Sequence, residues 1–267
     1  VNLQAAKNTS SQASTNSASS GSIGVSISAQ GVSATASASK GKGKSDGQDL
    51  SYTNTQISAG NTVSITSGGD TNVKGAVVEG NQIKADVGTS GQGSLNIESL
   101  QDTSTYTSSQ RSSGFSVSVP ITGAGSAGGS VSASKSNINS NFQSVGEQSG
   151  LKAGDGGFQV SVANNTDLKG GVIASTQKAV DSKANTFTTG GQLITTDVQN
   201  TASFSGKASG FSIEAGAKGV GGVGIGAGSD KGSAASTTAA GITGVAGNKA
   251  VRASDAEAGL QKIFDAD

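Results

Sequence analysis

The sequence predicts an all-β protein, specifically a right-handed parallel β-helix (β-solenoid) with Gly-rich β-hairpin extensions and a short C-terminal helix. Short segments alternate apolar and polar residues, as in TVSIT at residues 62–66 and FQVSV at residues 158–162. This period of two is typical of β-strands with one buried face. A unit of about 95 residues is also duplicated along the chain, and such internal repetition is typical of solenoids.

The composition favours a thin, repetitive core over a conventional globular one. Only 32% of the 267 residues are hydrophobic and 3% are aromatic, whereas 42 are glycine. A compact α/β enzyme is therefore disfavoured. Low hydrophobicity is also typical of disordered linkers, but the single proline and the regular alternation argue against disorder. A narrow column of aliphatic side chains, covered by Ser, Thr and Asn, fits this composition.

Missing residue types and balanced charge exclude several function classes. Cys and His are absent, which removes disulfides, thiolate nucleophiles, the usual zinc sites and the commonest general base. We therefore expect no enzyme activity, catalytic residue, metal or cofactor. The 18 basic and 18 acidic residues balance, so we expect no nucleic-acid ligand. Because no catalytic site is expected, we also expect no small-molecule substrate. The chain begins and stops within a pattern, which indicates a piece of a longer protein.

The duplicated units preserve their apolar positions. TNVKGAVVEG at residues 71–80 aligns with TDLKGGVIAS at residues 166–175, so that Val73 corresponds to Leu168. Val63 likewise corresponds to Phe158. Because polar neighbours drift while these positions stay apolar, we expect them to form the core. A shorter period of about 20 residues, from Gly60-Asn61 to Gly80-Asn81, has a suitable length for one coil.

We expect four segments from these repeats. Residues 1–50 form a partial repeat with a hairpin, residues 51–145 the first unit, residues 146–246 the second unit, and residues 247–267 a helical segment. In the last of these, Ser254 and Glu257 have capping-box spacing. Leu260, Ile263 and Phe264 follow at helical spacing.

Gly-rich segments at residues 20–39, 113–135 and 209–231 each predict a strand, a turn and a second strand. Their arms of about 8–10 residues approach the length that spans an outer membrane. Candidate membrane or partner contacts are the apolar residues that alternate in two of these segments: Phe115, Val117, Val119, Ile121, Phe211 and Ile213. The alternative is a hairpin folded on the flank of the solenoid.

Four other motifs have simpler interpretations. The glycine patterns beginning at Gly123 and Gly219 match a dinucleotide fingerprint, but neither lies in a βαβ context, and we interpret both as hairpin turns. Lys40, Lys42 and Lys44 indicate a solvated loop, and contact with lipid phosphates or lipopolysaccharide is the alternative.

Two acidic motifs were also considered, for catalysis and for calcium binding, and neither is interpreted as a site. Asp86, Glu98 and Asp102, with Arg111 near them, are too scattered for a polysaccharide-cleaving site. Gly68-Gly69-Asp70 lacks the nine-residue period of calcium-binding repeats.

Three long blocks resemble a known family. They are NTDLKGGVIAS at residues 165–175, GGQLITTDVQNTASFSGKASGFSIEAG at residues 190–216 and LQKIFDAD at residues 260–267. They are similar to the second haemagglutinin repeat region of filamentous-haemagglutinin-like exoproteins, in particular contact-dependent growth inhibition effectors. Residues 261–267 resemble the start of the pre-toxin segment of such proteins.

The resemblance implies a secreted protein at a Gram-negative cell surface, exported by a cognate outer-membrane two-partner secretion transporter. It further implies a non-catalytic, rigid module that associates with a target outer membrane or surface receptor and helps to deliver a C-terminal toxin. An adhesin stalk that binds host-cell or biofilm glycan or protein is the alternative.

Overall fold

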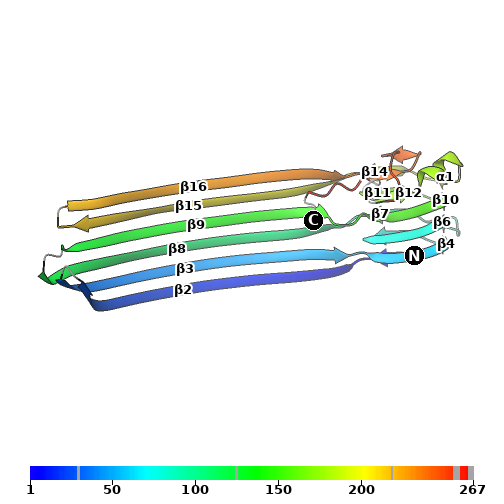
Figure 1. The fold of residues 1–267 in the computed structure, drawn as a ribbon. Coiled ribbons are helices and arrows are strands. Elements are labelled where there is room, and N and C mark those ends of the chain that lie inside the picture. The colour runs from blue at the N-terminus through cyan, green and yellow to red at the C-terminus, as the bar shows by residue number, and fades with distance from the viewer. Residues whose placement is uncertain (29–30, 124–125, 218, 255–258, 264–267) are drawn as a thin grey trace.

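The structure, a computed structural model, consists almost entirely of β-strands arranged in three sheets (Figure 1). It describes residues 1–28, 31–123, 126–217, 219–254 and 259–263. Two sheets of mainly parallel strands lie together at one end of the molecule, and a six-stranded antiparallel sheet extends from them. The all-β part of the prediction is confirmed.

The first parallel sheet stacks one short strand from each turn of the chain. Its order is β1 (Asn2–Gln4), β5 (Thr71–Lys74), β7 (Leu95–Glu98), β11 (Thr166–Lys169) and β14 (Leu193–Thr196). Parallel register places Leu3 beside Val73, Val73 beside Ile97, and Ile97 beside Leu168. Because equivalent apolar side chains lie at the same level, they form one continuous column.

The second sheet is mixed. Its order is β18 (Ala246–Gly247), β17 (Gly241–Ile242), β12 (Val172–Ala174), β10 (Gly150–Val162), β6 (Ala76–Val87) and β4 (Thr55–Ser67), and β13 (Thr186–Thr189) also pairs with β10. All of its pairs are parallel except β17 with β18. Val63 and Phe158 both pair with Ile83, so the 20-residue period corresponds to neighbouring strands.

The core lies between these two sheets. Successive strands alternate between them, since β4 and β6 belong to one sheet and β5 and β7 to the other. Their inward side chains form a single hydrophobic cluster that includes Val73, Ile83, Phe158 and Leu168, each with no exposed surface. The predicted core positions Val73, Phe158 and Leu168 are therefore confirmed, whereas Val63 is only partly buried and packs against the cluster.

Glycine is required at one corner of both duplicated units. Gly75 between β5 and β6 has φ +60°, and its counterpart Gly170 between β11 and β12 has φ +59°. A Cβ atom on Gly170 would also lie 2.9 Å from Val198 Cγ2. Since L-residues are strained in this region of φ, only glycine makes the corner without cost.

The third sheet, here called the hairpin sheet, consists of three hairpins side by side. Its order is β16 (Gly219–Thr238), β15 (Val198–Gly216), β9 (Gly128–Val145), β8 (Gln101–Gly123), β3 (Gly31–Thr53) and β2 (Ala6–Ser28), all antiparallel. Adjacent hairpins belong to successive repeats, so stacking of the parallel strands beneath brings them into contact.

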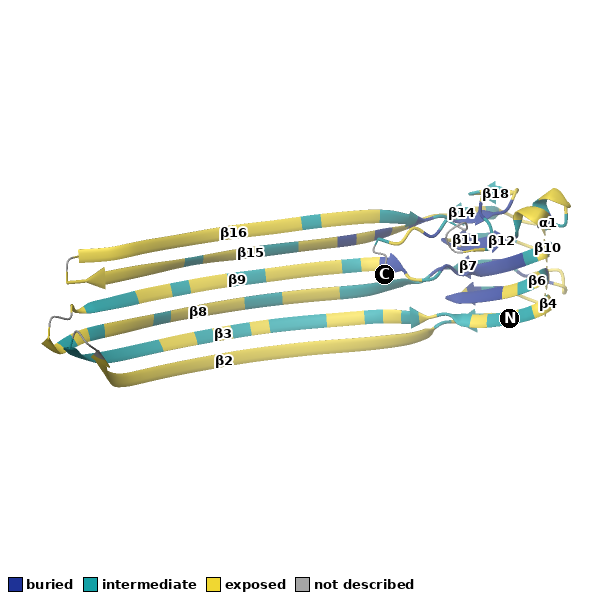
Figure 2. Ribbon diagram, viewed as in Figure 1, coloured by how far each residue is buried: buried dark blue, intermediate teal, exposed yellow. Residues whose placement is uncertain are grey.

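The hairpin sheet corrects three expectations. Its arms are 18–23 residues long, not 8–10, because the backbone pairing continues through the polar segments. The hairpins project from the parallel sheets and do not fold against their flank (Figure 2). Lys40, Lys42 and Lys44 lie in β3 and not in a loop.

One short helix lies in a segment for which the sequence did not predict a helix. The single helix of the described residues is α1 (Gln177–Asp181), capped by Thr176. The predicted C-terminal helix is absent from described residues 247–254 and 259–263, where Leu260 instead bridges Thr238 and contacts Val145 and Val198. This burial against the base of the hairpin sheet competes with helix formation. Glu257 and Phe264, and the rest of that segment, lie outside the described residues.

Two buried amide side chains hold the base of the hairpin sheet. The Asn200 side chain accepts a hydrogen bond from the Val145 backbone N–H at 3.0 Å and donates one to Thr238 Oγ1 at 3.0 Å. Gln148 Nε2 donates to the Gly170 and Ala239 carbonyls at 2.9 and 2.7 Å. These bonds fix the base of the hairpins because buried N–H groups need acceptors; among the described residues, Gln148 Oε1 has no hydrogen-bond partner.

Candidate functional site

One face of the hairpin sheet is apolar near the hairpin turns. Directly opposed residues of neighbouring strands point to the same side, and successive residues of one strand alternate between sides. Phe115 is opposite Val131, Val131 is opposite Ile213, and Ile213 is opposite Val223. The cross-strand register therefore joins all six strands in one surface, the apolar tip: Ile23, Val25, Ile27, Val32, Phe115, Val117, Val119, Val131, Phe211, Ile213, Val223 and Ile225.

The apolar tip is uncovered. Ile23 is 93% exposed and Ile225 82% exposed, and Phe115 and Phe211 each retain about half of their accessible surface. Figure 2 shows the same contrast between the exposed hairpins and the buried parallel strands. Contiguous exposed apolar surface on a folded protein is typical of a site of membrane or protein contact.

The structure brings together most of the predicted contact residues. Phe115, Val117 and Val119 of β8 share the face with Phe211 and Ile213 of β15. Ile121 does not join them by register, because Pro120 pairs with Ser33 and Thr122 with Val32, which leaves Ile121 at a β-bulge. Ile121 is nevertheless 58% exposed.

Sequence reasoning missed the outer strands of this surface. β2 contributes Ile23, Val25 and Ile27, and β16 contributes Val223 and Ile225. The alternation in SIGVSI and VGIGA carried the signal. Glycine and serine between the apolar residues lowered the hydrophobicity of each segment, so neither segment was predicted to be part of an apolar surface.

Behind the apolar tip the opposite face is polar, whereas nearer the base of the hairpin sheet it carries the exposed side chains of Tyr106, Ile138 and Phe204. Cross-strand hydroxyl pairs join Ser22 to Ser37 at 2.8 Å and Ser116 to Ser130 at 2.8 Å. Ser20–Ser39 and Ser112–Ser134 form equivalent pairs at 2.7 Å. The sheet is therefore two-sided, with an apolar tip on one face and hydroxyl ladders on the other.

Basic side chains follow the apolar tip on its own face. They form the basic band, which comprises Lys40, Lys42, Lys44, Arg111, Lys135 and Lys207. A groove of about 800 Å³ lies where the band meets the tip, lined among others by Lys42, Arg111, Lys135, Phe211 and Ile225. Only Lys40, Lys42 and Lys44 were visible as a cluster in the sequence, because Arg111 and Lys135 come from distant segments.

The acidic residues considered for catalysis do not form one site. Asp86 lies on β6, Glu98 on β7 and Asp102 on β8, so they belong to three different sheets. Burial raises the pKa of Asp102, and the hydrogen bond of 2.7 Å from the Tyr52 backbone N–H opposes that shift in part. Asp102 thereby ties β3 to β8 at the base of the hairpin sheet.

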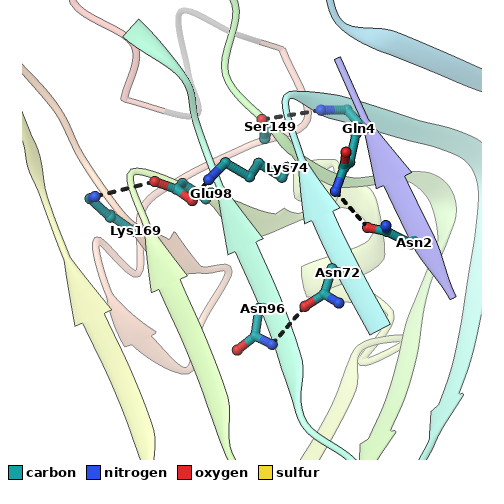
Figure 3. Close-up of polar contacts among 9 residues, drawn as sticks. Asn2, Gln4, Asn72, Lys74, Asn96, Glu98, Ser149 and Lys169 are labelled. Atoms are coloured by element: carbon teal, nitrogen blue, oxygen red, sulfur yellow. Dashed lines mark hydrogen bonds and ion pairs between the residues drawn. The ribbon is translucent and has the colours of Figure 1, made fainter. Parts of the chain in front are cut away.

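Glu98 belongs to a charged ladder on the first parallel sheet (Figure 3). Its carboxylate lies 2.9 Å from Lys74 Nζ on β5 and 3.2 Å from Lys169 Nζ on β11. Burial acts to raise the pKa of Glu98, but the hydrogen bonds and charges of the two lysines together lower it. In the same sheet Asn96 donates to Asn72 at 2.8 Å. These contacts hold neighbouring strands in register.

The remaining motifs have structural roles. Gly219 opens β16 with φ +111°, and Gly123 closes β8 with φ +95°, so both lie beside hairpin turns. Gly125 lies outside the described residues. Asp70 Oδ1 accepts a hydrogen bond from the Ser94 backbone N–H at 2.8 Å. Among the described residues no group of acidic side chains could hold a metal ion, and none of their helices is long and apolar enough to cross a membrane.

Comparison with known proteins identifies the repeat. Residues 1–113 match the family model described as "Hemagglutinin repeat". The chain is 39% identical over 219 residues, 80% of its length, to "Deoxyribonuclease CdiA" of Dickeya dadantii (strain 3937). It is 45% identical over 148 residues, 55% of its length, to "tRNA nuclease CdiA" of Yersinia mollaretii. It is a filamentous-haemagglutinin-like repeat region of the contact-dependent growth inhibition type.

The haemagglutinin-repeat region is a small part of such relatives. The aligned segments make up 6% of the Dickeya protein and 5% of the Yersinia protein. The protein of Escherichia coli (strain NC101) named "tRNA nuclease CdiA" is 42% identical over 170 residues, 64% of the chain and 5% of the relative. The nuclease names describe those whole proteins, whereas the matched family model describes a repeat.

Proposed function

We propose that this haemagglutinin-repeat region is a non-catalytic cell-surface module of a toxin-delivery protein, and that its hairpin sheet associates with the target cell's outer membrane. The apolar tip is the observation that carries the proposal. It offers exposed aliphatic and aromatic side chains from five of the six strands, and β3 adds the half-buried Val32. Burying such surface in hydrocarbon is favourable by about 25 cal/mol per Å².

The parallel sheets serve as a rigid stalk in this proposal, with the connectivity of a right-handed parallel β-solenoid. Support comes from the alternation of consecutive strands between two sheets and from the continuous column of Val73, Ile97 and Leu168. Each strand is hydrogen-bonded on both sides, except at the ends of the stack, which resists bending.

The wider context is part of the proposal. The module belongs to a secreted protein of a Gram-negative cell surface, exported by a two-partner secretion transporter, and the full-length protein binds a target-cell receptor or membrane. Its segments are residues 1–50, 51–145, 146–246 and 247–267. Similarity to CdiA proteins supports this assignment. Membrane association explains the apolar tip better than an adhesin stalk that binds glycan does, because buried sugar hydroxyls need hydrogen-bond partners.

Vesicle flotation tests membrane association. We expect the 267-residue chain to float with phosphatidylcholine vesicles, whose surface carries no net charge. In a triple variant, Phe115→Ser, Val117→Ser and Phe211→Ser, each substitution removes a side chain that is about half exposed and contributes about 1 kcal/mol on insertion. Binding should weaken by about 100-fold.

A matched control carries Ser116→Ala, Ser132→Ala and Ser212→Ala on the opposite face. It should float like the unmodified protein, because that face does not contact lipid. Failure of the unmodified chain to float, or equal flotation of the apolar-tip variant, would refute membrane association. Sedimentation of the unmodified chain as a dimer that the apolar-tip variant lacks would instead assign the surface to a second copy.

A further inference from the structure

The basic band places like charges directly opposite one another. Lys42 of β3 pairs in register with Arg111 of β8, and Arg111 pairs with Lys135 of β9. Like charges at opposed positions of an antiparallel sheet are destabilising. Lys40 and Lys44 lie two residues to either side of Lys42 on the same face, which adds to the repulsion. Folding alone gives no reason for this arrangement.

Acidic side chains do not neutralise the band. Within the described hairpin strands, Asp46 is the acidic residue on this face, and it forms an ion pair of 2.9 Å with Lys44. Asp49, Asp102, Glu214 and Asp230 occupy alternate positions that point to the opposite face. Among described residues, Lys40, Lys42, Arg111, Lys135 and Lys207 have no ion-pair partner within 4.0 Å. The uncompensated charge therefore faces outward.

The order of residues along the strands matches the order of layers in a membrane. On β3, Val32 to Ala38 are apolar at alternate positions, Lys40 to Lys44 follow, and Asp46, which pairs with Lys44, precedes the neutral Gln48. On β9, Val131 and Ala133 precede Lys135, which precedes asparagines. Proceeding from the hairpin turns, the face is thus apolar, then cationic, then neutral and polar. A lipid leaflet passes in the same order from hydrocarbon to phosphate to water.

The dimensions also agree. Six residue steps from Val32 to Ala38 cover about 20 Å at about 3.3 Å per residue, which is about 14 Å of depth for a strand tilted by about 45°. One leaflet contributes about 15 Å of hydrocarbon, half of the bilayer core. The basic band would then lie at the level of the lipid phosphates. The groove beside Phe211 and Ile225 offers room for a head group next to an apolar surface.

We propose that the basic band binds the phosphate groups of anionic membrane lipids while the apolar tip contacts their acyl chains. This inference rests on the proposed membrane association and adds the lipid class that the module selects. Juxtamembrane Lys and Arg residues each attract anionic lipid. The protein should therefore prefer an anionic leaflet to a neutral one, and the preference should fall as salt increases.

Flotation with two vesicle compositions tests the inference. The 267-residue chain is mixed with phosphatidylcholine vesicles or with vesicles that also contain phosphatidylglycerol, and we expect much tighter binding to the second. The band variant carries Lys42→Gln, Arg111→Gln and Lys135→Gln. It should lose on the order of 100-fold in affinity for anionic vesicles and keep its affinity for neutral ones. Circular dichroism should show intact folding, because the substitutions remove repulsion.

A charge-matched control carries Lys84→Gln, Lys183→Gln and Lys249→Gln on the parallel-sheet end. It should keep the preference for anionic vesicles. The inference would be overturned if the unmodified chain bound both vesicle compositions equally, or if the band and control variants lost the same affinity for anionic vesicles. In either case, flotation with neutral vesicles would still support the proposed function. The inference would also be overturned if inorganic phosphate released the protein from anionic vesicles more than sodium chloride of equal ionic strength does. Tighter binding to a DNA oligonucleotide than to anionic vesicles would overturn it as well. Absence of flotation with either composition would refute the proposed function itself.

Discussion

Replacing Leu168 with Asp tests the stacked core directly. Leu168 is fully buried on β11 beside Ile97 and belongs to the cluster that joins the two parallel sheets. The substitution removes about 2 kcal/mol of apolar burial and adds at least about 2 kcal/mol for an unpaired polar group. A loss of about 4 kcal/mol is a large share of a typical folding free energy.

Thermal unfolding followed by circular dichroism measures the effect. We expect Leu168→Asp to lower the Tm by about 8–16 °C or to prevent folding, and Val73→Asp to behave alike, because Val73 occupies the equivalent buried position. The control is Gln159→Asp, an exposed site opposite Lys84 in the parallel register. Its stability should change by about 0.5 kcal/mol or less. Unchanged melting of both core variants would refute the register.

Two further predictions concern charge and backbone geometry. Glu98→Gln should lower stability at pH 7 by about 1 kcal/mol or less, because the ion pairs are partly exposed. Since the folded pKa of Glu98 is lowered, its stabilisation is present above the ordinary pKa of about 4.3 and is lost as the pH falls through the folded pKa. Urea unfolding at pH 7 and at low pH measures this difference, and a constant difference would contradict the ion-pair ladder. Gly170→Ala should cost about 1–3 kcal/mol because of its positive φ, whereas Gly60→Ala, with open space around it, should leave the Tm nearly unchanged. Equal melting of these two variants would contradict the corner geometry.

Local pattern predicted much of the fold. Alternation located the strands around Val63 and Phe158, and the duplication identified Val73 and Leu168 as equivalent core positions. Both properties are local or recur along the chain, so they can be read without knowing what packs against them. At the described residues 259–263 the expected helix is absent for the opposite reason, because Leu260 packs on Val145 and Val198, which are remote in sequence.

The sequence by itself determined that the chain forms strands, repeats a unit and buries a narrow aliphatic column. Tertiary structure decided what the hairpins present to their surroundings. Phe115, Val131 and Ile213 become neighbours, and Lys42, Arg111 and Lys135 become an unneutralised row, only when hairpins of successive repeats pair side by side. Stacking of the parallel strands sets that pairing, and a register shift of one residue would move these side chains to the opposite face.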